Sequence, residues 1–277
     1  MTRSNVGFLS AALLLLLSSC GGGTTTPSGG ASTEGCSSPT NDAYARAVLA
    51  DKPAAYYRFD EAAGPTLCDA SGNHKNGTYS ATGVTYRQPG GPHRTSDTAI
   101  GADGSAQVAM SNANSGISGS MSFTLEGWFR TTAKQDQIVV EIGQAGAQTM
   151  AGLGPWMNQV SSTFATTPGT GDYISFDTYD GAFEFDASAA GINVFDGNWH
   201  YAAVSFSSTT SMASVYLDNR ALGSTSVPDR PAASPVRIGF WVDALFNKPF
   251  DGGLDEIAVY PSALTPDQIA RHYAATA

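Results

Sequence analysis

Two acidic side chains that flank a single residue are the most direct candidates for catalysis in this sequence. Glu184 and Asp186 lie in segment 182–186, which is typical of a strand, so both carboxylates point to one face. Retaining glycoside hydrolysis needs two carboxyl groups about 5–5.5 Å apart, one of them with a raised pKa. Acidic pairs also occur on the outer face of edge strands, where charge discourages unwanted pairing. We favour this second interpretation of the pair.

Aromatic residues beside amides and carboxylates form a second candidate site. Sugars are held by aromatic rings that stack on their CH faces and by hydrogen bonds from nearby polar groups, and exposed loops are the usual place for such sites. Segment 154–158 is predicted to be a turn, and segment 241–247 an exposed loop after a strand. Alternatively, the aromatic rings of segment 241–247 fold back over the core. The candidate ligand-binding residues are Trp156, Asn158, Trp241, Asp243, Phe246 and Asn247.

Other arrangements for catalysis are not evident in the sequence. There is no Gly-x-Ser-x-Gly segment after a strand, no phosphate-binding glycine loop, and His200 lies inside a predicted strand. The 14 Lys and Arg residues against 24 Asp and Glu residues give a net charge of −10. A nucleic-acid binder needs a basic face to neutralise phosphates, which this composition does not supply. We therefore expect a protein that is not an enzyme and does not bind nucleic acid.

The composition favours an all-β domain to position these residues. The chain has 31 Gly and 14 Pro residues, only 14% charged residues, and abundant Ser and Thr. Two short helices are expected at the ends of the domain: segment 42–51, capped by Asp42, and a helix that begins at the capping box Thr265–Gln268. The predicted strands are 54–60, 122–131, 137–142, 173–176, 182–186, 199–207, 212–217, 236–241 and 254–260.

The N-terminus has the pattern of an export signal. Arg3 precedes an apolar run that is too short to span a bilayer and ends in Leu17-Ser18-Ser19-Cys20. This end is similar to the lipobox of bacterial lipoproteins, which implies cleavage after residue 19 and acylation of Cys20. Residues 20–41, rich in Gly, Ser and Thr, are expected to be a flexible tether, and residues 42–277 one domain. The expected location is a bacterial membrane, the outer one in a Gram-negative host.

Two further cysteines, Cys36 and Cys68, remain after the candidate lipidation site. An exported protein folds in an oxidising compartment, where an even number of cysteines favours a disulfide over free thiols. Such a bridge would join the end of the tether to the first strands.

Four segments carry a resemblance to a known family. They are AYYRFDE at 55–61, DASGN at 69–73, DGNWHY at 196–201 and FDGGLDEI at 250–257. In this order and spacing they resemble bacterial laminin-G-like domains of the concanavalin A-like lectin/glucanase superfamily. The resemblance implies a jelly-roll sandwich of two antiparallel sheets with a short C-terminal helix.

The resemblance also implies a calcium site, because loop carboxylates and carbonyls are the ligands that Ca²⁺ prefers. Its expected ligands are Asp60, Glu61, Asp69, Asn73 and Asp255. Alternatively, Asp69 caps its own turn and Asp255 binds a strand end. Lys75 departs from the small neutral residues common in this loop, and its charge would repel a cation unless it points away.

Together these features predict a lipid-anchored surface module that binds carbohydrate or a glycosylated partner, with calcium as a structural ion. One alternative is a polysaccharide-cleaving hydrolase of the same superfamily. Its known members usually add a third acid after the pair, whereas segment 187–190 reads ASAA. A module that binds protein through a sheet face is the other alternative.

Overall fold

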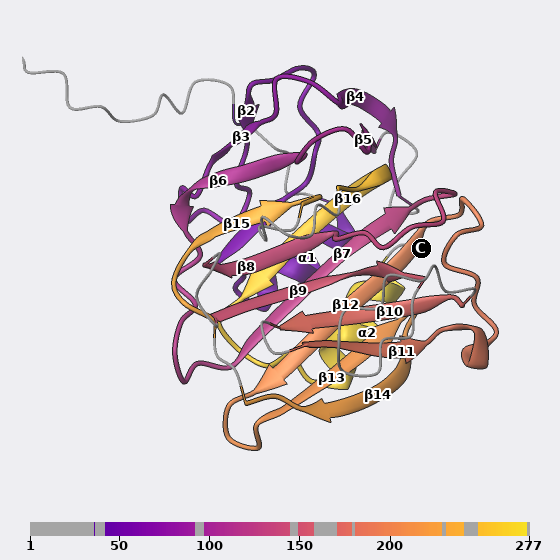
Figure 1. Cartoon of the computed structure of the whole chain (residues 1–277). Helices are drawn as coiled ribbons and strands as arrows, with labels where there is room; N and C mark the ends of the chain where they lie inside the picture. The colour runs from indigo at the N-terminus through magenta and orange to yellow at the C-terminus, as the bar shows by residue number, and fades with distance from the viewer. Residues whose placement is uncertain are drawn as a thin grey trace, which may run out of the picture. The chain divides into compact units, whose positions relative to one another are not determined.

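The computed structural model describes residue 36 and residues 42–91, 97–144, 149–157, 171–178, 181–228, 231–240 and 249–275. In these residues the strands form two antiparallel sheets that face each other as a sandwich (Figure 1). The expected jelly-roll sandwich with a short C-terminal helix is therefore confirmed. Among the described helices, none has the length and apolar character needed to cross a membrane.

Sheet A and sheet B each contain eight strands within the described residues. Sheet A has the order β14 (Arg220–Ser226), β13 (Met212–Leu217), β12 (His200–Ser207), β7 (Phe123–Arg130), β16 (Asp251–Tyr260), β5 (Thr98–Asp103) and β4 (Val84–Pro89), with β1 (Ala55–Tyr57) also pairing with β16. Sheet B has the order β11 (Gly181–Asp186), β10 (Tyr173–Thr178), β9 (Thr149–Trp156), β8 (Val140–Gln144), β15 (Pro235–Ile238), β6 (Ala109–Asn114), β3 (Gly77–Tyr79) and β2 (Thr66–Leu67).

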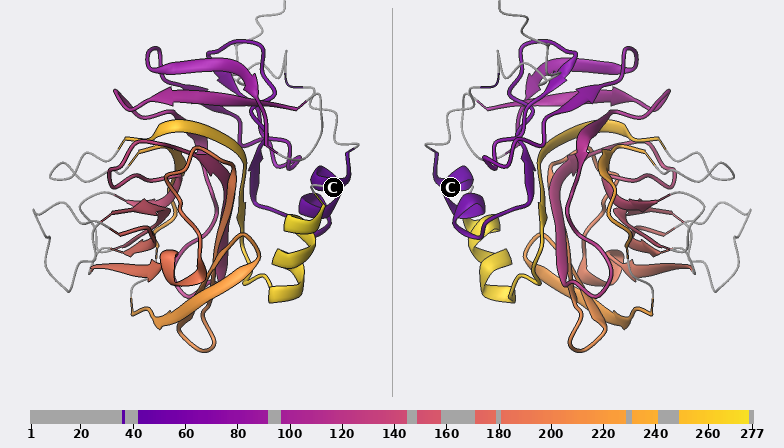
Figure 2. Two further views of the ribbon diagram at one scale, coloured as in Figure 1. Left: turned by 90° about the vertical axis from the view of Figure 1, so that its right-hand side faces the viewer. Right: turned by 90° about the vertical axis from the view of Figure 1, so that its left-hand side faces the viewer.

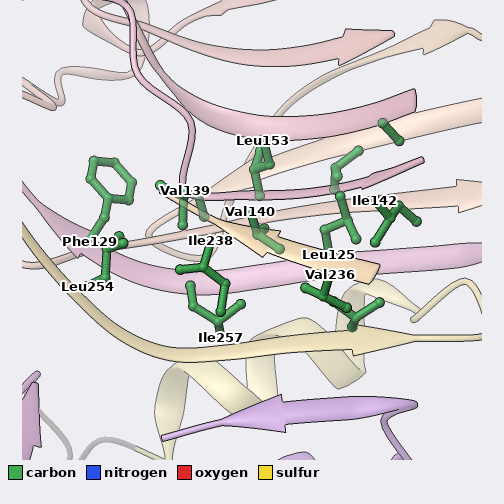
Figure 3. Close-up of a cluster of buried hydrophobic side chains, with 14 of the residues drawn as sticks. Leu125, Phe129, Val139, Val140, Ile142, Leu153, Val236, Ile238, Leu254 and Ile257 are labelled. Atoms are coloured by element: carbon green, nitrogen blue, oxygen red, sulfur yellow. The ribbon is translucent and has the colours of Figure 1, made fainter. Parts of the chain in front are cut away.

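Apolar side chains from both sheets fill the space between them (Figure 3). The sequence of strand β7 supplies such apolar side chains at alternate positions. Phe123, Leu125 and Phe129 point into the shared core, whereas Trp128 and Glu126 point to the opposite face. That opposite face is also buried, which explains why almost the whole strand is shielded from water. The predicted alternation of this strand is confirmed.

The helices α1 (Ala43–Ala50) and α2 (Pro266–Ala274) lie side by side against sheet A (Figure 2). The Asp42 carboxylate accepts a hydrogen bond from the backbone N–H of Ala45 at 2.7 Å and caps α1. The Thr265–Gln268 capping box begins α2. Both predicted helices are therefore confirmed, with the caps that the sequence indicates.

A buried carboxylate, Glu126, links both helices to sheet A. It accepts hydrogen bonds from the hydroxyls of Tyr201 at 2.5 Å and Tyr260 at 2.7 Å. Its oxygens lie 3.1 Å from Nδ1 of His272, a residue of α2. The other ring nitrogen of His272 lies 3.0 Å from Oδ2 of Asp51, just after α1. This network, which we call the Glu126 hub, satisfies polar groups that would otherwise be costly to bury.

Several strand predictions need correction. The predicted turn 154–158 overlaps β9, which runs straight through Trp156. The predicted strands 137–142 and 236–241 correspond to β8 and β15, with shifted bounds. Strands β2–β6 and β14 were not predicted. Of these, β4 and β14 lie at the edges of sheet A, and their exposed polar residues hide the strand pattern.

The predicted strands 199–207 and 212–217 pair with each other as β12 and β13, and 173–176 and 182–186 pair as β10 and β11. In the turn after β13, Asp218 and Asn219 both have positive φ, 46° and 62°. Asn and Asp tolerate this conformation better than other non-glycine residues, so the turn forms without the usual glycine. Cys36 and Cys68 form a disulfide, as predicted.

Candidate functional site

Three buried carboxylates meet where the start of β5 lies near β16 in sheet A. Ligand atoms of Asp97, Asp255 and Glu256 all lie within 4.8 Å of one another. Asp97 immediately precedes β5, whereas the other two are consecutive residues of β16. We call this group the carboxylate cluster.

A bulge in β16 brings the two consecutive carboxylates into one cluster. Neighbouring residues of a regular strand point to opposite faces. Here the register between β16 and β7 shifts between Asp255 and Ala258, and Glu256 has a φ of 50°. Such a bulge redirects side chains, which allows both acids to face the same place.

Arg58 partly neutralises this region. Its Nη2 lies 3.1 Å from Oε1 of Glu256, 2.8 Å from Asp42 Oδ2, 3.7 Å from Asp60 Oδ2 and 3.9 Å from Asp97 Oδ1. The Tyr56 hydroxyl also donates to Glu256. Glu256 is thus the best-compensated acid of the cluster, and a single guanidinium faces several carboxylates.

Asp255 is only partly compensated by its neighbours. Its Oδ2 accepts a hydrogen bond from the N–H of Gly91 at 2.7 Å, but no donor among the described residues reaches its buried Oδ1. Burial raises the pKa of Asp255, and the charges of Asp97 and Glu256 raise it further. Burial likewise raises the pKa of Glu256 to about 8, against the lowering effect of Arg58. A proton or a cation is needed to make this arrangement favourable.

Three of the five expected calcium ligands are engaged elsewhere. The Asp69 carboxylate accepts hydrogen bonds from four donors of residues 56, 71 and 75, so it caps its own turn. Glu61 accepts hydrogen bonds from the N–H of Cys68 and the hydroxyl of Tyr79, each at 2.7 Å. Asn73 donates to two backbone carbonyls. Among the expected ligands, only Asp255 belongs to the carboxylate cluster, with Asp60 near its Arg58.

Sequence reasoning missed two members of the cluster, Glu256 and the more distant Asp97. The segment that Asp97 precedes was not predicted to be a strand, so nothing placed it beside β16. The sequence carries one signal of this strand, since Asp97 stands two residues before the short apolar run Ala99-Ile100. The hydroxyl of Thr98 donates to Asp60 Oδ1 at 3.3 Å, which links the opening segment to this strand.

A second group of polar residues lies on the face of sheet B that points away from the core. Glu141, Gly152 and Asp177 are directly opposite one another on β8, β9 and β10. Both carboxylate side chains are buried, although they are outside the apolar core. Arg237 of β15 lies opposite Glu141, with Nη1 3.4 Å from Oε1, and Ser175 donates to Asp177. We call this row the polar face of sheet B.

Trp156 lies on the same strand as Gly152, and its even spacing from Gly152 along the strand places it on the polar face. Its side chain is only 4% exposed, so it is not the exposed turn residue that the sequence predicted. The polar face itself was missed because acids in short strands are also common on ordinary outer faces. The remaining expected ligand-binding residues, Asn158, Trp241, Asp243, Phe246 and Asn247, lie outside the described residues.

Glu184 and Asp186 lie on β11, the edge strand of sheet B, as the second interpretation of this pair proposed. Asp186 is exposed and accepts hydrogen bonds from the Ser188 hydroxyl and the Ala189 N–H, which lower its pKa. A general acid needs the opposite shift in pKa.

His200 lies between Asp218 and Asp196, at 2.8 and 3.2 Å from their carboxylate oxygens. Burial lowers its pKa, but these two carboxylates raise it above the ordinary value.

The two facing antiparallel sheets have the architecture of a lectin-like β-sandwich. Residues 100–270 match the family profile described as the concanavalin A-like lectin/glucanases superfamily, and the chain belongs to this family. A search of curated proteins found no match.

Solved structures with the same fold include binding domains of larger proteins. Domain 4 of AbnA, a GH43 extracellular arabinanase from Geobacillus stearothermophilus solved with arabinotriose, is 17% identical with a TM-score of 0.54, covering 80% of this chain and 98% of that domain. The binding domain of Paraclostridial Mosquitocidal Protein 1 is 14% identical with a TM-score of 0.54, and that of botulinum neurotoxin serotype D is 10% identical with 0.55. These matches cover 81% and 82% of this chain but only 52% of each toxin domain. At such identities they show the fold alone.

Proposed function

We propose that this chain is a carbohydrate-binding module without catalytic activity of its own, carried on a lipid-anchored tether. The observation that carries the proposal is the polar face of sheet B. Glu141, Asp177 and Arg237 provide charged acceptors and donors in one row, and sugar hydroxyls need both. Gly152 lies in the middle of that row and adds no side chain between Glu141 and Asp177. Trp156 supplies an aromatic ring on the same face.

The fold supports the same proposal. Domain 4 of AbnA was solved with a bound arabinotriose, and it has the architecture described above for this chain. The Asp186 carboxyl has a lowered pKa, which does not suit it to donate a proton to a leaving group. The third acid that usually follows such a pair in hydrolases of this superfamily is also absent from segment 187–190, and we propose binding rather than hydrolysis.

We further propose that the carboxylate cluster holds a structural calcium ion. Asp97 and Asp255 would provide its protein ligands, with Asp60 at the rim, because all offer the hard oxygen atoms that calcium requires. The buried Asp255 Oδ1, which no described donor reaches, fits a cation. Bound calcium would neutralise the cluster and join the opening segment to the closing strand.

The binding proposal is tested with the chain from residue 20 onward carrying Cys20→Ser, on a panel of neutral polysaccharides in calcium. We expect retention of at least one neutral polysaccharide without release of reducing sugar. Asp177→Asn should weaken that retention about tenfold, because an amide cannot replace a charged acceptor. Asp186→Asn, on the edge strand, serves as the matched control. Release of reducing sugar would indicate the hydrolase, and no retention of any glycan would favour a protein-binding module.

The lipid anchor is tested separately in a bacterial host. The wild-type chain should fractionate with membranes, and Cys20→Ser should move it to the soluble exported fraction, because the acyl chains supply the affinity for the bilayer. Mass spectrometry of the N-terminal peptide checks acylation directly. A wild-type chain that is recovered without lipid would contradict this part of the proposal.

A further inference from the structure

A groove beside the end of α1 carries two lysines that the proposed function does not use. It has a volume of about 660 Å³, within the usual range for small-ligand sites. Lys52 and Lys75 reach it from two different segments, and Ser71, Asn73 and Ser115 add further polar groups. It is formed by the opening segment and the loop after β2, away from the polar face of sheet B.

The two ammonium groups of this groove are not neutralised by nearby acids. Lys75 Nζ donates to the backbone carbonyl of Asn114 at 2.5 Å, which leaves two of its three donors for other partners. It therefore points to the end of β6, a strand of sheet B. No carboxylate among the described residues forms an ion pair with Lys52 or Lys75.

The acids closest in sequence to these lysines are already engaged. Asp51, next to Lys52, accepts from Gln268 at 2.7 Å and lies 3.0 Å from both Arg271 and His272. Asp69 is fully used in capping its own turn. The groove is thus a local concentration of positive charge on a protein whose net charge is −10. Polyanions are repelled by such a protein overall, so their binding would require a dedicated local site.

Lys52 has a backbone conformation that glycine adopts with less strain. Its φ is 56°, and its N–H closes the last turn of α1 on the carbonyl of Leu49. Residues that end a helix in this conformation are usually Gly or Asn, because a side chain there is strained. A lysine at this position therefore lowers the stability of the fold through backbone strain. Its side chain lines the groove.

We propose that this groove binds an anionic saccharide, so that the module recognises acidic as well as neutral glycans. The ammonium groups of Lys52 and Lys75 would pair with the anionic groups of the sugar, and the exposed Asn73 would accept from its hydroxyls. Leu49, Pro53 and Pro261 provide apolar walls for the CH faces of the ring. The inference rests on the proposed carbohydrate-binding function and assigns it a second subsite. Uronate carboxylates and sugar sulfates offer the same chemistry.

The test compares polygalacturonate, dextran sulfate and the neutral polysaccharide retained in the first experiment, by affinity electrophoresis at low salt with calcium. The variants are Lys52→Gly, Lys75→Ala and their combination, and Lys134→Ala is the control because it is an exposed lysine outside the groove. Lys52→Gly suits the positive φ, so it should fold at least as well as wild type. We expect the double variant to bind the acidic polymer about tenfold more weakly, with the neutral polymer unaffected.

The outcomes separate this inference from the proposed function. Binding of the neutral polymer with no binding of either polyanion would overturn the anionic subsite and leave the module intact. Polyanion binding that Lys134→Ala weakens as much as the double variant would also overturn it. Retention of only one of the two polyanions would support the subsite and identify which anionic group it takes. Loss of all glycan binding in the wild-type chain would overturn both.

Discussion

Replacing Asp255 with Asn should have opposite effects on the melting temperature with and without calcium. In a chelator, Asp255→Asn should melt at a higher temperature than wild type, because the variant removes a carboxyl group that must either take up a proton or stay charged when it is buried beside Asp97 and Glu256. In calcium it should melt at a lower temperature, because an essential ligand of the ion is gone. An ion at about one hundred times its Kd contributes roughly 2.7 kcal/mol, which corresponds to about 5–10 °C for a domain of this size.

Asp69→Asn is the matched control for this prediction. Its carboxylate accepts from three donors of its own loop and from the N–H of Tyr56 on β1, so this variant should lose a similar amount of stability in calcium and in chelator. Thermal unfolding followed by circular dichroism provides all the measurements. A calcium response that survives in Asp255→Asn but disappears in Asp69→Asn would place the ion in the Asp69 turn instead.

Removing the Glu126 carboxylate should be among the most destabilising single changes in the domain. Glu126→Ala would leave the hydroxyls of Tyr201 and Tyr260 and the ring of His272 without their shared buried acceptor. Breaking a buried pair in this way costs about 3–5 kcal/mol. Asp267 is an exposed acid of α2, the helix that carries His272, and Asp267→Ala should change the free energy of unfolding by only about 0.5 kcal/mol.

The pH dependence of the same variant distinguishes loss of the ion pair from a packing defect. Burial lowers the pKa of His272, but Glu126 and Asp51 raise it above the ordinary value. A raised folded pKa stabilises the protein fully below the unfolded value of about 6.5, and this contribution disappears as the pH rises through the folded value. The difference in unfolding free energy between wild type and Glu126→Ala should therefore be larger at pH 6 than at pH 9.

Urea titrations in calcium at the two pH values measure this difference. His200 titrates in the same direction but is held by Asp196 and Asp218, so it contributes equally to both proteins and cancels. A difference between wild type and variant that is the same at pH 6 and pH 9 would show that Glu126 acts by filling space and not through His272.

Much of the scaffold could be predicted because its signals are local. The alternation of Phe123, Leu125 and Phe129 indicates a strand with one face in a core, and the structure confirms it. The capping residues of the two helices act on N–H groups three positions away. The disulfide followed from compartment and an even count of cysteines.

The sites were harder to predict because they depend on pairing between distant segments. Asp97 approaches Asp255 only because β5 pairs with β16, and Asp255 approaches Glu256 only because β16 has a bulge. Glu141 and Asp177 share a row only because β9 separates them in that exact register. Of the expected calcium ligands, only Asp255 lies in the carboxylate cluster, whereas the Asp69 carboxylate accepts hydrogen bonds from residues 56, 71 and 75.

For this protein, the sequence by itself determined the all-β class, the two capped helices, the disulfide and the family. Each depends on residue types, short spacings or ordered motifs, which can be recognised in the sequence without knowing the fold. Only the tertiary structure decided which acids meet, which lysines lack a counter-charge, and which face of sheet B is polar. These properties arise from strand order and register, because a shift of one residue in pairing moves every side chain to the opposite face.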